Sequence, residues 1–180
     1  MADNGAFRSV TLLKTRARKL HRRAQFGDAR ALARLRTLPE LKGLDDAALV
    51  AAVRRRHALA TVARQTGFGS WGHALSVLRG TESRDFGTLL YPSRCGPYPN
   101  IWCAGHDEAR AIRGHHGGYL LAWRRHCLIV DEHFISALGL DPADEDWQRM
   151  SRDWVRPADL AARDRLYATL VREATEPAGG

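Results

Sequence analysis

The sequence lacks any long hydrophobic run, and its longest apolar stretches, such as residues 127–130, are only a few residues long. A membrane-spanning helix needs about 20 apolar residues, so we predict no membrane span. The first 20 residues also lack the basic patch, apolar core and small-residue cleavage site of a secretory signal. Only three of the 180 residues are cysteine. This low, odd count excludes a disulfide framework and favours reduced thiols in a cytoplasmic protein.

Lysine is also scarce, because only three of the 28 basic residues are lysine. The positive charge is therefore carried by arginine, which forms bidentate contacts with phosphate and carboxylate groups. Residues 1–80 hold 16 Lys and Arg against five Asp and Glu, a net charge of +11, and residues 81–180 hold 12 against 15, a net charge of −3. A GC-rich coding bias explains the arginine content but not this segregation. The basic half predicts a polyanionic partner, with nucleic acid first and an acidic protein second.

Helical periodicity runs through residues 1–80, and we predict a basic helical module of four short helices there. The first predicted helix covers residues 9–25, with apolar residues on one face at Leu13, Ala17, Leu20 and Ala24. Gly27 and Asp28 predict a helix stop followed by a new N-cap, and Asp45 or Asp46 predicts a third helix start. We expect a break in the apolar pattern near residues 54–57 and a last helix over residues 70–78.

The pattern changes after residue 80, and residues 81–180 predict a small mixed domain with a β-hairpin and C-terminal helices. The predicted strands cover residues 86–91, 101–104, 119–123 and 126–130, of which the last two form the hairpin. The predicted helix starts are Asp107, Asp131, Asp141-Pro142 and Pro157. The whole chain is therefore predicted to belong to the α+β class.

One segment of the basic half resembles a short helical module of bacterial proteins, which occurs beside ankyrin repeats or glyoxalase-related domains. The resemblance covers about residues 10–80 and rests on the stretch ALATVARQTGFGSW, preceded by GDARALARLR. The matching positions are Ala60, Ala63, Arg64, Gly67, Phe68, Ser70 and Trp71. The resemblance implies an accessory or interaction unit with no attached chemistry, in which Phe68 and Trp71 are core anchors.

Residues 57–78 also have the general layout of a helix-turn-helix. A recognition helix needs Arg, Asn, Gln or Lys side chains that reach base edges. The second helix offers only Ser70, Trp71, His73 and Ser76 before Arg79. Sequence-specific base reading is therefore not favoured, and a plain helical packing unit is the preferred interpretation.

The preferred candidate site is the arginine-rich surface of the N-terminal helices. Lys14, Arg18 and Arg22 lie four residues apart and share one helical face. Like charges this close repel one another, and a bound anion would relieve that repulsion. The alternative interpretation of this surface is a solvated helix face with no ligand. The predicted phosphate-binding residues are Lys14, Arg18, Lys19, Arg22, Arg23, Arg54, Arg55 and Arg56.

A second candidate uses thiol and imidazole groups. Cys103 and His106 have a ligand-like spacing, and Cys95 could join them as a zinc ligand, but no paired CxxC motif is present. The same Cys103 and His106 could instead form a nucleophile–base pair oriented by Asp107 or Glu108. Phosphate-loop, dinucleotide-binding and metalloprotease motifs are absent, and no cofactor is expected.

The sequence thus predicts a non-catalytic binding protein that contacts nucleic-acid phosphates through its N-terminal arginines. Two alternatives stay open, namely a small cytoplasmic enzyme or metal-binding protein using Cys103 and His106, and an interaction adaptor for an acidic protein partner.

Overall fold

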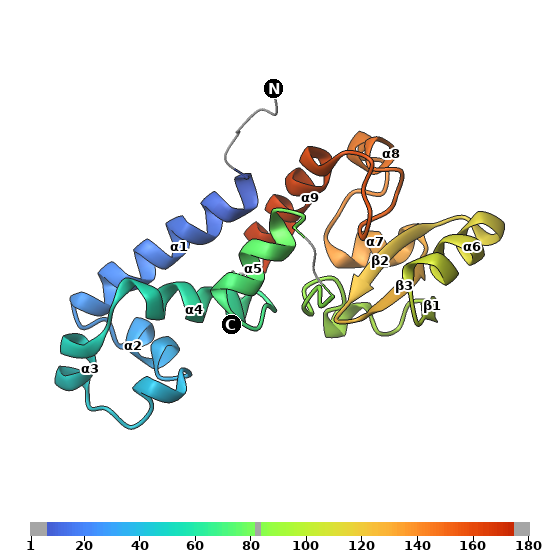
Figure 1. The fold of residues 1–180 in the computed structure, drawn as a ribbon. Helices are drawn as coiled ribbons and strands as arrows, with labels where there is room; N and C mark the ends of the chain where they lie inside the picture. Colours follow the sequence, from blue (N-terminus) through green and yellow to red (C-terminus); the bar gives the residue numbers. More distant parts are fainter. Residues whose placement is uncertain (1–6, 82–83, 175–180) are drawn as a thin grey trace.

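The computed structural model describes residues 7–81 and 84–174, in which helices dominate and one small sheet lies toward one end (Figure 1). The described residues form nine α-helices, two short 3-10 helices and a three-stranded antiparallel sheet. The predicted α+β class is confirmed. The sequence also predicts a short connection at residues 81–84 and a tail at residues 176–180. The first lies partly, and the second wholly, outside the described residues.

The N-terminal half is helical, as predicted. Its elements are α1 (Arg8–Gln25), α2 (Ala29–Leu35), the 3-10 helix η1 (Pro39–Leu41), α3 (Asp46–Ala52), α4 (Arg55–Gln65) and α5 (Trp71–Leu78). Asp28 accepts a hydrogen bond from the amide of Ala31 at 2.7 Å, and Asp45 accepts one from the amide of Ala48 at 2.8 Å. Both predicted N-caps are thus confirmed. The predicted break near residues 54–57 separates α3 from α4, so the described residues of this half form five α-helices rather than the predicted four.

The turn between α4 and α5 requires glycine at position 67 and buries Phe68. Gly67 has a φ of +94°, and an added Cβ would lie 2.9 Å from the backbone nitrogen of Leu89. A side chain at this position would therefore meet both backbone strain and a steric clash. The amide of Phe68 then donates to the carbonyl of Ala63 at 3.0 Å, which closes the end of α4. Phe68 is only 2% exposed and is a core residue.

In the C-terminal half, helix α6 (His106–His116) packs against a small sheet that consists of the hairpin and a third strand. Its elements are the 3-10 helix η2 (Ser93–Cys95), β1 (Asn100–Cys103), α6 (His106–His116), β2 (Tyr119–Trp123), β3 (His126–Val130), α7 (Glu132–Leu138), α8 (Glu145–Arg149) and α9 (Leu160–Glu173). The strand order is β1-β3-β2, so β3 is central, and Leu128 pairs with both Trp102 and Leu121. The predicted hairpin and the cap at Asp131, which accepts from the amide of Phe134, are confirmed.

Several local predictions for this half are wrong. Residues 86–91 are all described and form no strand. The amide of Phe86 instead donates to Arg124 in the hairpin turn, and the amide of Thr88 donates to Gly67, so the segment fastens two turns together. Helix α6 begins one residue before Asp107, which lies within its first turn rather than at its cap.

The last two helix starts are shifted along the chain. Helix α8 begins at Glu145 behind Asp144, not at Pro142, and α9 begins at Leu160 behind Asp159, not at Pro157. In both cases the N-cap is the aspartate whose carboxylate accepts a hydrogen bond from an amide of the first helical turn. Side-chain capping rather than the proline therefore fixes these helix starts.

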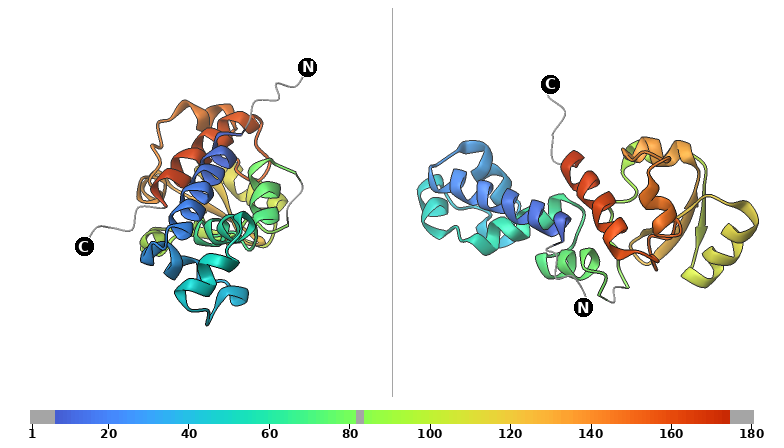
Figure 2. Two further views of the ribbon diagram at one scale, coloured as in Figure 1. Left: turned by 90° about the vertical axis from the view of Figure 1, so that its left-hand side faces the viewer. Right: turned by 90° about the horizontal axis from the view of Figure 1, so that it is seen from above.

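Helices α1 and α9 lie side by side, although they come from opposite ends of the chain (Figure 2). The buried carboxylate of Asp164 in α9 accepts from the amides of Arg8 and Ser9 at 2.7 and 3.2 Å and also from the Ser9 hydroxyl. Asp164 thus caps α1, because the N-cap residue Phe7 makes no side-chain cap of its own. In return, Arg16 of α1 donates to the carbonyls of Val171 and Arg172 at the end of α9.

The hydrophobic core is continuous across residue 80. One cluster of buried residues extends from Val10 in α1 to Val171 in α9 and includes the inner face of the sheet. A smaller cluster lies beneath α6 and contains Cys103, Ala109, Leu120, Cys127 and Ile129. The division into units 1–80 and 81–180 stays a prediction, and any such units share a core and a pair of docked helices.

Candidate nucleic-acid interface

A wide cavity lies along the C-terminal half of α1, between α2 and the end of α9. Its volume is about 1220 Å³, which exceeds the roughly 300–1,000 Å³ of ordinary small-molecule pockets. It is lined by Arg16, Lys19, Leu20, Arg22, Arg23, Phe26, Asp28, Arg34 and Arg172. We call this cavity and its lining residues the arginine groove. Its size fits an extended ligand rather than an enclosed metabolite.

The groove forms because one flank of α1 carries cations beside its apolar stripe. Successive helical residues are rotated by about 100°, so Arg16, Lys19 and Arg23 lie on the same flank. Leu13, Ala17 and Leu20 next to them are buried and hold the helix on the core. Across the groove, Arg34 of α2 donates from Nε and Nη2 to Oε1 of Gln65 at 3.1 and 2.5 Å. The fold therefore brings cations from three helices to one cavity.

The arginines of the groove repel one another. Burial lowers the pKa of Arg16, and the nearby charge of Arg34 lowers it further. Burial likewise lowers the pKa of Arg34, with a second contribution from Arg23. Among the described residues that line the groove, Asp28 is the only acid, and its carboxylate is already engaged as the cap of α2. A bound anion would therefore stabilise the cluster.

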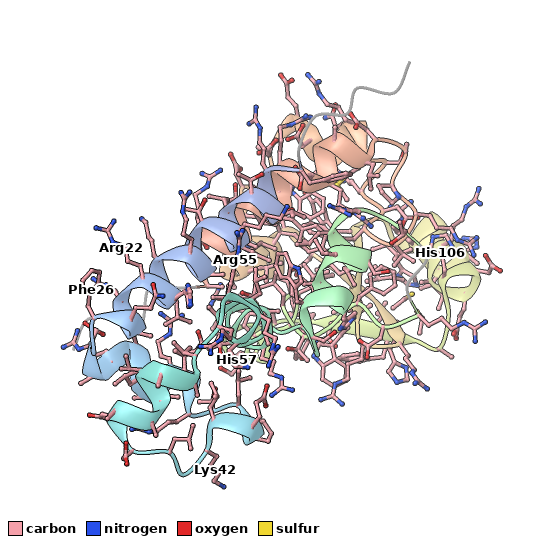
Figure 3. All side chains as sticks on the ribbon, turned by 60° about the vertical axis from the view of Figure 1, so that its left-hand side comes forward. Arg22, Phe26, Lys42, Arg55, His57 and His106 are labelled. Carbon is pink, nitrogen blue, oxygen red and sulfur yellow. The ribbon has the colours of Figure 1, made fainter. Side chains whose placement is uncertain are left out.

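An aromatic side chain stands at the mouth of this basic groove. Phe26 is 79% exposed, the most exposed of the large hydrophobic side chains described. It follows the last residue of α1, and Figure 3 shows Arg22 and Phe26 projecting outward at the same end of that helix. A cationic groove beside an exposed ring has the two components of a single-strand binding surface, namely phosphate contacts and a stacking platform.

The structure divides the predicted phosphate-binding residues into three places. Lys19, Arg22 and Arg23 line the groove, whereas the exposed Lys14 and Arg18 lie outside its lining on the outer face of α1. Arg54, Arg55 and Arg56 surround the start of α4 and are also outside the lining. The guanidinium of Arg54 donates to the carbonyls of Ala51 and Val53 at 2.7 and 3.0 Å, which gives it a structural role.

Sequence reasoning missed Arg16, Phe26, Arg34 and Arg172 as groove residues. Arg34 and Arg172 reach the groove only through the packing of α2 and α9 on α1, which no local pattern reveals. Phe26 had a weak signal, because it is an aromatic residue directly before the Gly27 helix stop and outside the apolar stripe.

The α4–α5 unit presents few groups that could read bases. Ser70 caps α5 by accepting from the amide of His73 at 3.1 Å. The His73 ring is engaged on both sides, since Nδ1 accepts from the amide of Gly69 and Nε2 contacts the carbonyl of Asp85. These side chains hold the turn together, as expected for a packing unit.

The structure does not bring Cys95, Cys103 and His106 together. Cys95 is buried in the main core, and Cys103 is buried in the small cluster beneath α6. In the described part of the chain, no group of three or more His, Cys, Asp or Glu side chains is arranged to hold a metal ion.

The alternative of a Cys103–His106 nucleophile–base pair finds no hydrogen bond between the two side chains among the described residues. Nε2 of His106 lies 2.7 Å from Oδ2 of Asp153, so this imidazole is paired with a carboxylate. Burial raises the pKa of Cys103, with a further rise from Glu108, which is opposite to the shift that a thiolate nucleophile needs.

Within the described residues, none of the helices has the length and apolar character needed to cross a membrane. Comparisons with protein-family models, with curated proteins and with solved structures find no match to this chain.

Proposed function

We propose that this protein binds single-stranded nucleic acid in the arginine groove. The observation that carries the proposal is the juxtaposition of the mutually repelling cations Arg16, Arg23 and Arg34 with the exposed ring of Phe26. Phosphates would neutralise the cations, and a base would stack on the ring, whose exposure to water is otherwise unfavourable. Binding of this kind depends little on sequence.

The competing ligand is an acidic protein segment, which offers charge but no stacking bases. The two ligands differ at Phe26, because an acidic peptide needs no ring there. The breadth of the groove and its arginine-rich lining fit a phosphodiester backbone, since the guanidinium fork matches phosphate in a bidentate manner.

The testing experiment is fluorescence-anisotropy binding of the full chain to a labelled single strand between 50 and about 300 mM salt. About four phosphate contacts predict a slope of log Kobs against log salt near −3. Replacing Arg22→Gln and Arg23→Gln together should lower the affinity by about tenfold and reduce the steepness of the slope by about 1.4.

A matched pair on the same helix serves as the control. Lys14→Gln with Arg18→Gln removes the same charge from the outer face of α1, outside the groove lining. This pair should weaken binding far less than the groove pair. Equal losses in the two variants would contradict a groove, and absence of binding at 50 mM salt would refute the proposed function.

A further inference from the structure

A second basic cavity lies at the other end of the molecule, between α6 and the loop that follows α8. Its volume is about 290 Å³, at the small end of ligand pockets. It is lined by His106, Arg110, Arg113, Ser151, Asp153, Arg156 and Ala158. Figure 3 shows that His106 is far from the end of α1 that carries Arg22 and Phe26. We call this cavity the α6 pocket, and the arginine groove makes no use of it.

One face of α6 supplies half of the pocket. His106, Arg110 and Arg113 are spaced at i, i+4 and i+7, so they line up on one side of the helix. Arg113 donates from Nη1 to the carbonyls of Ser151 and Arg152, both at 2.7 Å, and so fixes the opposite wall. Arg110 is exposed and makes no hydrogen bond or ion pair within the described residues, which leaves its guanidinium available to a ligand.

The opposite wall is a strained and firmly held loop. Ser151 and Arg152 have φ values of +58° and +51°, which are unfavourable for residues with side chains. The loop is fixed to the edge of β2, because the amide of Leu120 donates to Arg152 and the amide of Trp154 donates to Leu120, both at 2.9 Å. The loop thereby presents Asp153 and Arg156 to α6. Strain maintained in this way is typical of binding sites.

A buried His–Asp pair joins the two walls. The side chains of His106 and Asp153 are 9% and 8% exposed, and the other carboxylate oxygen of Asp153 accepts from the amides of Val155 and Arg156. The other ring nitrogen of His106, Nδ1, is buried and has no hydrogen-bond partner in the described chain. Its nearest charged neighbour is Oδ1 of Asp107 at 3.6 Å, which also lies 3.6 Å from Arg156.

The charges of the lining define the ligand. The lining holds three arginines and the one carboxylate of Asp153, which leaves an excess of two positive charges. Asp107 lies outside the lining, 3.6 Å from Arg156, and the two side chains are 91% and 68% exposed, so solvent screens this ion pair. A phosphate monoester carries about two negative charges and three acceptor oxygens, which match this excess and the guanidinium donors. A carboxylate supplies one charge and two oxygens and would leave the pocket positive.

We propose that the α6 pocket is a binding site for the phosphate group of a small phosphate monoester. Arg110 and Arg156 contact the phosphate oxygens, while Arg113 and the His106–Asp153 pair shape the pocket. An adjoining cavity of about 280 Å³ shares His106 and Arg156 and is also lined by Val77, Phe86 and Val155, which gives room for the organic part. The terminal phosphate of a nucleic-acid strand is a second source of the same group.

The experiment is calorimetric titration of the full chain with inorganic phosphate and with glycerol 3-phosphate in low-chloride buffer. The pocket variant is Arg110→Gln with Arg156→Gln, and because both side chains are exposed we expect it to stay folded. The control is Lys42→Gln with Arg125→Gln, which removes the same charge from two exposed residues outside both cavities. We expect the pocket variant to bind both probes at least tenfold more weakly and the control to bind them as the wild type does.

Three outcomes would overturn the proposal: no binding of either probe at 10 mM, binding by the pocket variant equal to that of the wild type, or an equal loss of binding in the control variant. The source of the phosphate is resolved by comparing 5′-phosphorylated with 5′-hydroxyl strands. A preference for the phosphorylated strand that the pocket variant abolishes assigns the pocket to strand ends. A preference for glycerol 3-phosphate over inorganic phosphate, with equal binding of the two strands, assigns it to small monoesters.

Discussion

His57 shows how one side chain controls the start of a helix. It is 6% exposed, and its Nδ1 accepts from the amide of Arg54 at 3.1 Å at the beginning of α4. Burial lowers its pKa below the ordinary value of 6.5, and the charges of Arg56, Arg54 and His21 lower it further, against an opposing effect of Glu40. The imidazole is therefore held neutral, which is the form that can accept this hydrogen bond.

The lowered pKa of His57 predicts acid sensitivity. The unfolded chain takes up the proton at a higher pH than the folded chain, so stability is unaffected above the unfolded pKa near 6.5 and decreases as the pH falls below it. Urea unfolding at pH 7.5 and pH 5.5 should show a loss of stability that is smaller in His57→Asn, which keeps an acceptor but cannot be protonated. The same loss in both proteins would contradict this role.

The three cysteine thiols are free and buried, which suits a packing role rather than a reactive one. Cys95, Cys103 and Cys127 are all buried, and burial raises the pKa of Cys127 to about 11. At pH 7.5 each thiol should stay protonated and inaccessible. We expect iodoacetamide to label them only after unfolding in urea, as followed by mass spectrometry. Modification of Cys103 in the native protein within minutes would indicate a reactive thiol and revive the nucleophile hypothesis.

Phe26 separates single-strand binding from a purely electrostatic interaction. Phe26→Ala removes the stacking platform but no charge. The affinity for a single strand should fall by about 1–3 kcal/mol, or roughly 5- to 150-fold, with the salt slope unchanged. Binding to duplex, whose bases are already stacked, should not change. Phe26→Tyr should restore single-strand affinity, and equal effects on duplex and single strand would rule out stacking.

At the scale of elements, the packing of α1 against α9 connects the two ends of the chain. We call this contact the α1–α9 joint. Each helix supplies the capping group that the other lacks, Asp164 at the start of α1 and Arg16 at the end of α9. Arg16 thereby also lies in the arginine groove, so the joint positions part of the proposed binding surface.

Loss of this joint should destabilise the whole protein. Asp164→Ala leaves the amides of Arg8 and Ser9 and the Ser9 hydroxyl without their acceptor in a buried position, at a cost of about 2 kcal/mol. The measurement is the free energy of unfolding in urea. Glu145→Ala, which removes an exposed i,i+4 ion pair, should change it little. Equal changes in the free energy of unfolding for the two substitutions would show that capping by Asp164 does not stabilise the protein.

Local patterns predicted the elements whose determinants are local. The helices capped by Asp28, Asp45, Ser70 and Asp131 were predictable, because cap and apolar stripe lie within a few residues. Residues 86–91 were not, because their apolar content suits a strand while their hydrogen-bond partners lie in two distant turns. The apolar pattern alone does not determine whether α9 begins at Pro157 or after Asp159, so its start could not be predicted from the sequence.

At the scale of the whole molecule, the candidate sites depend on contacts that sequence spacing does not encode. Lys19, Arg22 and Arg23 were predictable from α1 alone, whereas Arg34 and Arg172 join them through tertiary packing. His106 was recognised from the sequence as a chemically capable residue, but its partner Asp153 lies 47 residues away, where no local pattern reveals it. The two basic cavities share no lining residue, so variants at one leave the lining of the other unchanged.

The most direct test of the central claim locates the nucleic acid on the protein. The full chain is mixed with a single strand that contains 5-bromodeoxyuridine, and the complex is irradiated. The cross-linked peptides are then identified after trypsin digestion. The account predicts cross-links in the tryptic peptide of residues 24–30, which contains Phe26. In Arg22→Gln with Arg23→Gln, trypsin releases Phe26 in a peptide of residues 20–30, and the account predicts that the cross-links are lost from that peptide. Cross-links confined to peptides of residues 84–174, or unchanged in the groove variant, would contradict it.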